Sequence, residues 1–280
     1  MEIIVLLENT KEKGSNFCIE HGMSLLLEIN DKKILFDSGG PENSAIINAS
    51  KLGINLETID IAVISHGHGD HTGGLKEFIK INSKAPVLLK KEVFNQYYSL
   101  LPQGYKNIGT SREILEKYPK RFKFIEKTVK IAPNIFLVPN ITKTFPIPTS
   151  NNVLFTNTNN EMIKDTFEHE LFMVVEKGKD LVIFSGCGHN GIKNIVNTAI
   201  QLFSQKTVGT VIGGFHLQAG SSDYAIASKN EILEIAEWLK SSVKGEIYTG
   251  HCTGKQGIDL MKIILQSRIK SLYTGLKIKL

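Results

Sequence analysis

The chain has 280 residues, of which 41% are hydrophobic and 22% charged, values that are ordinary for a globular protein. Its formal net charge is only +5, and its lysines and arginines are scattered without a long basic block. Because nucleic-acid-binding surfaces concentrate positive charge, this composition disfavours a nuclease and suits a small anionic molecule at least as well.

The cysteines and the N-terminus indicate where the protein works. Cys18, Cys187 and Cys252 form no CxxC pair and cannot all pair with one another, which fits a reducing cytosol. Residues 1–8 lack the basic segment of a signal peptide, and no apolar run approaches the roughly 20 residues of a membrane span. We expect a soluble, cytoplasmic protein that does not bind membranes.

The first third of the chain alternates short strand-like runs with turns. Strands are predicted at residues 3–7, 24–28 and 33–36, with hairpin turn chemistry at 29–32. A helix is predicted at 41–52. Residues 60–65 are apolar and β-branched and predict a buried strand, followed by a helix that begins near residues 75–79.

Residues from about 90 to 160 differ in character, with clustered aromatic residues, many lysines and prolines at 146 and 148. We expect an excursion near the site entrance that holds helices, loops and one or two strands. Phe94, Tyr97, Tyr98 and Tyr105 could line a substrate there, although aromatic residues at this spacing are more often part of a core.

The second half is more regular. Strands are predicted at 171–175, 181–185, 208–213 and 246–249, and helices at 190–203, 230–240 and 257–265. Both halves therefore place strands before helices, and two packed sheets with helices outside would bury every apolar face. We predict an α/β fold, a four-layer αββα sandwich, in one domain of residues 1–280. Residues 271–280 could pack on a sheet or pair across a homo-dimer.

The run His66-Gly-His-Gly-Asp-His71 is the strongest functional signal in the sequence. His66 and His68 are two residues apart after a predicted strand, so both rings point to one side of an extended chain. Asp70 and His71 follow where the chain turns into a helix. Imidazole and carboxylate groups bind zinc and iron, and four of them in six residues exceed what one tetrahedral ion takes from a tight loop. The run predicts two metal ions.

The pattern His66-x-His68-x-Asp70-His71 resembles the signature of the metallo-β-lactamase superfamily. Residues 34–39, Ile-Leu-Phe-Asp-Ser-Gly, are similar to that family's strand-Asp-x-Gly turn. The resemblance covers nearly the whole chain, and it implies the metallo-β-lactamase fold. It also implies two divalent metal ions, usually zinc and sometimes iron or manganese.

Three later histidines end predicted strands, where sites of layered α/β proteins usually open. They are His189 in Ser-Gly-Cys-Gly-His, His216 in Gly-Gly-Phe-His and His251 in Gly-His-Cys-Thr-Gly. The sequence departs from the common family pattern, because Cys187 stands where many members carry a bridging aspartate. These motifs instead resemble a dihydropterin ribofuranosyl-aminobenzene 5′-phosphate synthase-like subgroup.

From the resemblance we assign His66, His68 and His189 to one metal, and Asp70, His71 and His251 to the other. A hydroxide that bridges the metals would be the nucleophile, and Asp70 would orient it or accept its proton. His216 is a candidate general acid or substrate contact. Asp37 would fix a ligand imidazole, and Cys187 is expected to be a small buried residue more often than a ligand.

The predicted function is a metal-dependent hydrolase that acts on a phosphoester or other ester of a small anionic substrate. The alternative is a condensing or transferase activity of the pterin-linked synthase subgroup. Redox chemistry at a di-iron site is disfavoured because no residues remain for a flavodoxin-like domain. A non-enzymatic binding protein would lack ligands, whereas this set looks complete.

Overall fold

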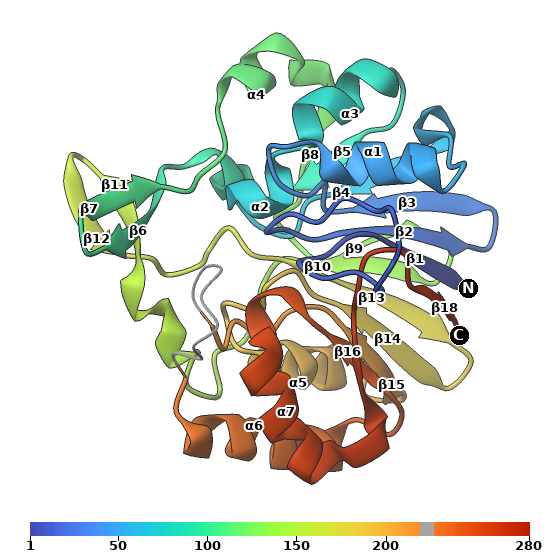
Figure 1. Ribbon diagram of the computed structural model, residues 1–280, viewed down its shortest axis with the longest axis vertical. Coiled ribbons are helices and arrows are strands. Elements are labelled where there is room, and N and C mark those ends of the chain that lie inside the picture. Colours follow the sequence, from blue (N-terminus) through green and yellow to red (C-terminus); the bar gives the residue numbers. More distant parts are fainter. Residues whose placement is uncertain (219–226) are drawn as a thin grey trace. The chain divides into compact units, whose positions relative to one another are not determined.

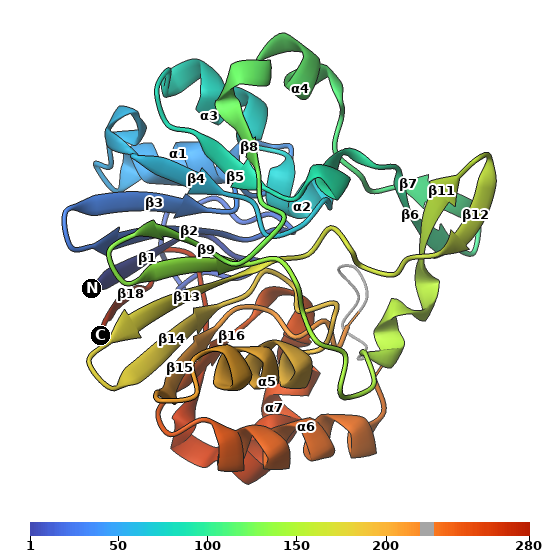
Figure 2. The same ribbon diagram turned by 180° about the vertical axis from the view of Figure 1, so that it is seen from behind.

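A computed structural model describes residues 1–218 and 227–280. The chain divides into two compact units (Figure 1, and from behind in Figure 2). Unit 1 comprises Met1–Ile125, Leu154–His169 and Leu272–Leu280, and unit 2 comprises Glu126–Val153 and Glu170–Ser271. Each unit is built from separate stretches of chain, so neither is a continuous half of the sequence.

Unit 1 contains a sheet of the order β18-β1-β2-β3-β4-β5-β8. The strands from β18 to β3 are antiparallel, and those from β3 to β8 are parallel. Their bounds are β1 Glu2–Leu7, β2 Ser24–Ile29, β3 Lys32–Phe36, β4 Ile61–Val63, β5 Val87–Leu89, β8 Phe122–Phe124 and β18 Lys277–Lys279.

The helices of unit 1 cover this sheet from one side, where α1 and α3 lie next to its strands in Figure 1. Their bounds are α1 Ser44–Lys51, α2 Gly69–Thr72, α3 Leu75–Ile81 and α4 Glu113–Lys117. Buried apolar side chains of these helices and strands form one core, which includes Leu26, Leu35 and Phe78. Pairing with β3 and β5 and packing in this core therefore position the end of β4, where the histidine run begins.

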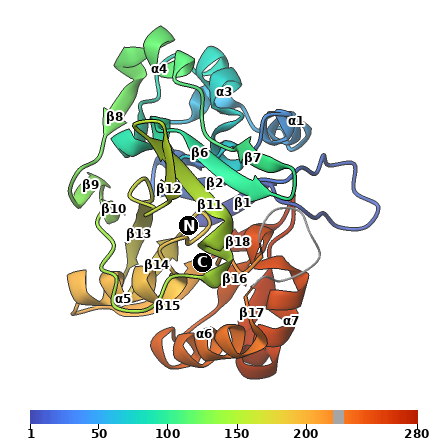
Figure 3. The ribbon, with the colours of Figure 1, turned by 90° about the vertical axis from the view of Figure 1, so that its left-hand side faces the viewer.

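A small antiparallel sheet of the order β12-β11-β6-β7 completes unit 1 (Figure 3). Its strands are β6 Tyr97–Leu101, β7 Gly104–Asn107, β11 Leu154–Thr158 and β12 Glu161–Lys164. It exposes several large apolar side chains, among them Leu100, Tyr105 and Ile163.

Unit 2 contains a sheet of the order β17-β16-β15-β14-β13-β10-β9. It is parallel from β17 to β14 and antiparallel from β14 to β9. The strands are β9 Val129–Ala132, β10 Ile135–Val138, β13 Phe172–Lys177, β14 Asp180–Phe184, β15 Thr207–Ile212, β16 Ile247–Thr249 and β17 Ile269–Ser271.

Three helices lie together on one face of that sheet (Figure 2). They are α5 Ile192–Leu202, α6 Lys229–Ser242 and α7 Gly254–Leu265, and their apolar sides share a core with the strands. The Ser228 side chain caps the N-terminus of α6, because its hydroxyl oxygen accepts the backbone N–H of Glu231 at 3.2 Å. The three connections that follow β14, β15 and β16 leave the sheet at the carboxyl ends of parallel strands.

The predicted helices and strands of both halves are present, with bounds that differ by a few residues. The expectation for residues 90–160 was wrong in one respect, since that fully described stretch holds β6, β7, β8, β9, β10 and β11 rather than one or two strands. Within the described residues, none of the helices is long and apolar enough to span a membrane.

Candidate metal centre

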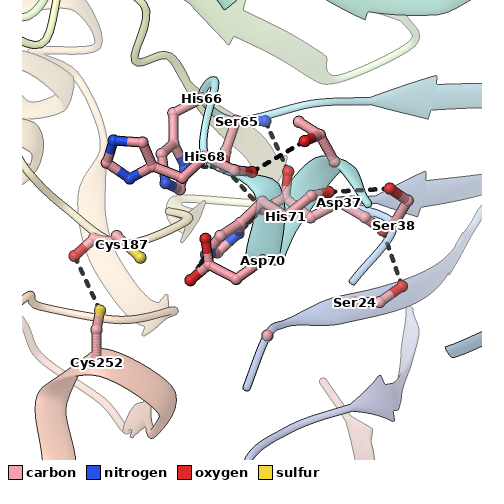
Figure 4. Close-up of polar contacts among 12 residues, drawn as sticks. Ser24, Asp37, Ser38, Ser65, His66, His68, Asp70, His71, Cys187 and Cys252 are labelled. Carbon is pink, nitrogen blue, oxygen red and sulfur yellow. Dashed lines mark hydrogen bonds and ion pairs between the residues drawn. The ribbon is translucent and has the colours of Figure 1, made fainter. Parts of the chain in front are cut away.

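The histidine run of unit 1 follows β4, in the connection to α2 and in α2 itself. His66 and His71 are fully buried, and His68 is 4% exposed. The ligand atoms of His66, His68 and Asp70 all lie within 4.8 Å of one another (Figure 4). The structure therefore brings the residues of the run together, and neutral imidazole with carboxylate is a donor set that suits divalent transition metals.

Asp37 organises the rings from the end of β3. Its carboxylate accepts the backbone N–H and the hydroxyl of Ser65, both at 2.7 Å, and lies 2.6 Å from Nδ1 of His71. Because the single hydroxyl proton of Ser65 goes to Asp37, Ser65 Oγ must accept from Nδ1 of His66, 2.9 Å away. Both Nδ1 atoms are thus protonated, and Nε2 of His66 and His71 keeps the lone pair that a metal needs.

Burial also keeps two of the rings neutral. It lowers the pKa of His68 to about 3, with a further contribution from His169 that outweighs the opposing effect of Asp70. Burial, followed by the neighbouring His71 and His68, lowers the pKa of His66 well below its ordinary value. Since imidazole binds metals only in its neutral form, the metal would not have to displace a proton from either ring near neutral pH.

Asp70 is more accessible than the three histidines of the run, with a side chain that is 20% exposed. Its Oδ2 atom lies 3.8 Å from Nε2 of His71 and 3.3 Å from Nε2 of His21. His21, which precedes β2 in the chain, therefore borders Asp70.

Sequence reasoning missed the role of His169, which lies 102 residues beyond Gly67 in the chain. The backbone N–H of Gly67 donates to Nδ1 of His169 at 2.8 Å, and Nε2 of His169 lies 3.1 Å from the Asp165 carboxylate. The Tyr97 ring packs on His169 with centroids 4.1 Å apart. Burial opposes the ionisation of Asp165, but the hydrogen bond from His169 holds the pKa of that carboxyl below its ordinary value. His169 therefore holds the backbone of the histidine run in place through Gly67.

The second group of candidate residues lies in unit 2. His189 follows β14 and is fully buried. Its backbone N–H and that of Asn190 donate to the Glu170 carboxylate at 2.8 and 2.7 Å. The Asn151 amide donates to the His189 carbonyl, so its oxygen faces Nδ1 of His189, 3.0 Å away. As in unit 1, this arrangement protonates Nδ1 and orients Nε2 as the ligand atom.

His216 and His251 follow β15 and β16, and both have left-handed backbones, with φ of 43° and 47°. Such angles are uncommon for non-glycine residues and often mark functional positions. The His216 ring lies 4.1 Å from that of His189, centroid to centroid. The Cys187 sulfur lies within 4.8 Å of a ring nitrogen of each of His189, His216 and His251. These later histidines therefore gather around Cys187.

The aromatic wall suggested by the sequence does not form as one surface. Phe94 is buried and packs on Phe122, with ring centroids 5.3 Å apart, while Tyr97 is buried against His169. Tyr105 lies on the small sheet and remains 46% exposed. The core interpretation was correct for Phe94 and Tyr97.

Comparisons with known proteins agree with this architecture. Residues 20–153 match the model of the metallo-beta-lactamase superfamily. The chain is 31% identical to 7,8-dihydropterin-6-methyl-4-(beta-D-ribofuranosyl)-aminobenzene-5'-phosphate synthase of Methanocaldococcus jannaschii, over 100% of this chain and 96% of the relative. It is 33% identical to an uncharacterized protein of the same organism, over 90% of each chain.

Among solved structures, the crystal structure of Tm1679 is described as a metal-dependent hydrolase of the beta-lactamase superfamily. It shares 34% identity with this chain and has a TM-score of 0.82, covering 100% of this chain and 99% of that one. The predicted α/β fold is thereby confirmed as the metallo-β-lactamase fold. Full-length similarity, together with the histidine run, shows that the chain belongs to the metallo-beta-lactamase superfamily.

Proposed function

We propose that this chain is a metal-dependent hydrolase that cleaves a phosphoester or other ester of a small anionic substrate. One observation carries the proposal. His66, His68 and Asp70 hold their ligand atoms within 4.8 Å of one another, and both rings are kept neutral by burial. The full-length similarity to Tm1679, described as a metal-dependent hydrolase, supports the same reaction class.

The proposed centre takes two divalent cations, with zinc first and iron or manganese as alternatives. Family resemblance assigns His66, His68 and His189 to one cation, and Asp70, His71 and His251 to the other. When bound, such cations lower the pKa of water and polarise the oxygen of an ester.

Residues of the chain would orient the ligand rings and accept a proton. Asp37 fixes the ring of His71 directly and that of His66 through Ser65. Asp70, being partly exposed, can accept a proton at Oδ2, beside the imidazole of His21.

A cavity of about 340 Å³ in unit 1 supports the choice of an anionic substrate. It adjoins α2 and is lined by Lys76 and Lys117 together with the hydroxyls of Thr110 and Ser111, with Glu113 as the acidic residue among them. Ammonium and hydroxyl donors of this kind bind phosphate or carboxylate groups.

A second candidate reaction follows from the similarity to the Methanocaldococcus jannaschii synthase. The chain would then join a dihydropterin to a ribofuranosyl-aminobenzene 5′-phosphate: the new bond forms at the methyl carbon of the pterin as a leaving group departs from that carbon, and the attacking group of the aminobenzene loses a proton. This reaction also uses an anionic substrate, so the cavity favours neither candidate. The two are separated by the products they form.

The test combines metal content with turnover. The purified protein is analysed for metals and assayed on phosphomonoesters, phosphodiesters and carboxylic esters, before and after chelation and metal re-addition. We expect two or more metal ions per chain and ester cleavage that returns with the metal. The His68→Ala variant should lose metal and activity together, and full turnover in that variant would refute the proposal. Joined product without ester cleavage would establish the synthase candidate instead.

A further inference from the structure

Unit 2 holds a cluster of soft metal ligands in addition to the histidines that family resemblance assigns. Cys187, His216 and Cys252 come from the connections after β14, β15 and β16. Their sulfur and ring-nitrogen atoms all lie within 4.8 Å of one another, and all three residues are buried.

The backbone around Cys252 is shaped to hold its sulfur. A Cβ atom on Gly214 would lie only 2.5 Å from Sγ of Cys252, so the absence of a side chain there makes room for the sulfur. The backbone N–H of His216 donates to the same Sγ at 3.3 Å. This contact fixes the position of the sulfur, and cysteine sulfur is a ligand that soft cations prefer.

The second cysteine belongs to the same packed arrangement. The Cys252 thiol donates a hydrogen bond to the backbone carbonyl oxygen of Cys187, with the sulfur and oxygen atoms 3.5 Å apart (Figure 4). This contact ties the Cys252 side chain to the backbone of Cys187, so the two cysteines are held next to each other. Bond lengths of about 2.3 Å for zinc–sulfur and 2.0 Å for zinc–nitrogen place tetrahedral ligand atoms roughly 3.5 Å apart. The observed spacing of at most 4.8 Å needs only a small inward movement of side chains.

We propose that Cys187, Cys252 and His216 form a further binding site for a soft divalent cation such as zinc, next to the ring nitrogens of His189 and His251. Two thiolates and one imidazole select soft cations over magnesium, calcium or manganese. Binding releases the two thiol protons to solvent and leaves one tetrahedral position for a further ligand. His216 then serves as a metal ligand, in place of the general acid expected from the sequence.

The inference does not rest on the proposed hydrolase, because none of the three residues belongs to the ligand set of that centre. Cys187 also lies within 4.8 Å of ring nitrogens of His189 and His251. Cys252 is therefore the decisive residue. If Cys187 served only the binuclear centre, the removal of the Cys252 thiol would leave thiolate–metal bonding intact.

Titration of the metal-free full-length protein with Cd²⁺ tests the site. The ultraviolet charge-transfer absorption from thiolate to cadmium should appear in the unsubstituted protein. It should also appear in the matched control Cys18→Ser, because Cys18 lies in unit 1 and the cluster lies in unit 2. We expect Cys252→Ser and Cys187→Ser each to lose most of this absorption. His68→Ala should retain it. Undiminished absorption in Cys252→Ser would overturn the proposal.

A second measurement uses the unsubstituted protein, so its result does not depend on whether the variants fold. Zinc X-ray absorption of the fully loaded protein should report two sulfur ligands on one of the bound cations. Sulfur-free coordination of every cation would contradict the site, whatever the fate of the hydrolase assay.

Discussion

At the scale of single residues, Ser65 connects Asp37 to the His66 ring, and Ser24 provides a matched comparison. Both hydroxyls are buried and donate to oxygen atoms of Asp37, Ser65 to the carboxylate at 2.7 Å and Ser24 to the backbone carbonyl at 2.8 Å. Only Ser65 also accepts from a candidate ligand. We expect Ser65→Ala to weaken metal binding about 10- to 100-fold, because the His66 ring loses its orientation.

The Ser24→Ala variant should leave metal affinity unchanged, although either substitution costs about 1 kcal/mol of stability through the lost hydrogen bond. Competition against a chromophoric chelator measures affinity, and denaturant unfolding measures stability. Equal affinities in the two variants would show that Ser65 only supports the fold.

The lowered histidine pKa values predict how the metal-free protein responds to acid. An unfolded histidine takes up a proton near pH 6.5, whereas folded His68, with a pKa of about 3, does not. Below pH 6.5 the unfolded state therefore binds more protons, and stability falls as the pH falls. The loss caused by His68 alone should steepen as the pH falls below 6.5 and approach about 1.4 kcal/mol per pH unit near pH 5, and His66 acts in the same direction.

Denaturant unfolding in the presence of a chelator, at several pH values, measures this slope. His68→Gln should flatten it by about one proton. A slope that is unchanged by the substitution would assign the acid sensitivity to other groups.

Adjacency in sequence decides which site residues could be predicted. Four candidate ligands fall within the six consecutive positions 66–71, namely His66, His68, Asp70 and His71. The end of one predicted strand was therefore enough to bring them together. The contact between Gly67 and His169 depends on tertiary structure, and the acidic neighbours Glu168 and Glu170 were its only local signal. Glu170 was missed for the same reason, since it acts through the backbone of His189 and Asn190.

At the scale of elements, the junction of α2 and α3 packs against the loop after β3. A Cβ atom on Gly74 would lie 2.2 Å from the carbonyl oxygen of Ser38, so that only glycine fits. We expect Gly74→Ala to lower the free energy of unfolding by about 3 kcal/mol, because backbone must move to make room.

Gly69, the first residue of α2, is the control for that substitution. A Cβ atom there would meet its nearest neighbour, the Ile108 carbonyl oxygen, at an ordinary 3.5 Å. Gly69→Ala should therefore remain within about 1 kcal/mol of the parent protein, since alanine also favours the helix. Comparable losses in the two variants, measured by denaturant unfolding, would mean that loop packing does not explain the need for glycine.

Hydrophobic patterning predicted buried elements better than exposed ones. The strands β13 and β14 are apolar and almost wholly buried, and their positions were predicted within two residues. The strand β7, Gly-Tyr-Lys-Asn, is exposed over three of its four residues and lacks apolar alternation. Its pairing with β6 arises from backbone hydrogen bonding, which leaves no periodic signal in the sequence.

At the scale of the whole molecule, both units repeat one arrangement, a sheet that is part parallel and part antiparallel with helices on one face. Functional residues follow the carboxyl ends of parallel strands in each unit, which agrees with the general rule for sites in α/β sheets. The sequence predicted this because each candidate histidine, from His66 to His251, directly followed a strand-like run. The single domain of residues 1–280 stays a prediction.

The proposed ligand set makes metal content depend on histidines that lie far apart in the sequence. In a Cys252→Ser background, which removes the soft site, we expect two tightly bound zinc ions per chain. His189→Ala and His251→Ala should each retain about one, because each removes a ligand of a different cation. Each lost cation should also lower stability, by about 2.7 kcal/mol when free zinc is 100 times its dissociation constant. His21→Gln, which alters a neighbour of Asp70 outside the ligand set, should keep both ions. Elemental analysis after gel filtration measures the number of bound zinc ions per chain. If both His189→Ala and His251→Ala retained two ions, the ligands would all belong to the histidine run and the proposed ligand set would be wrong.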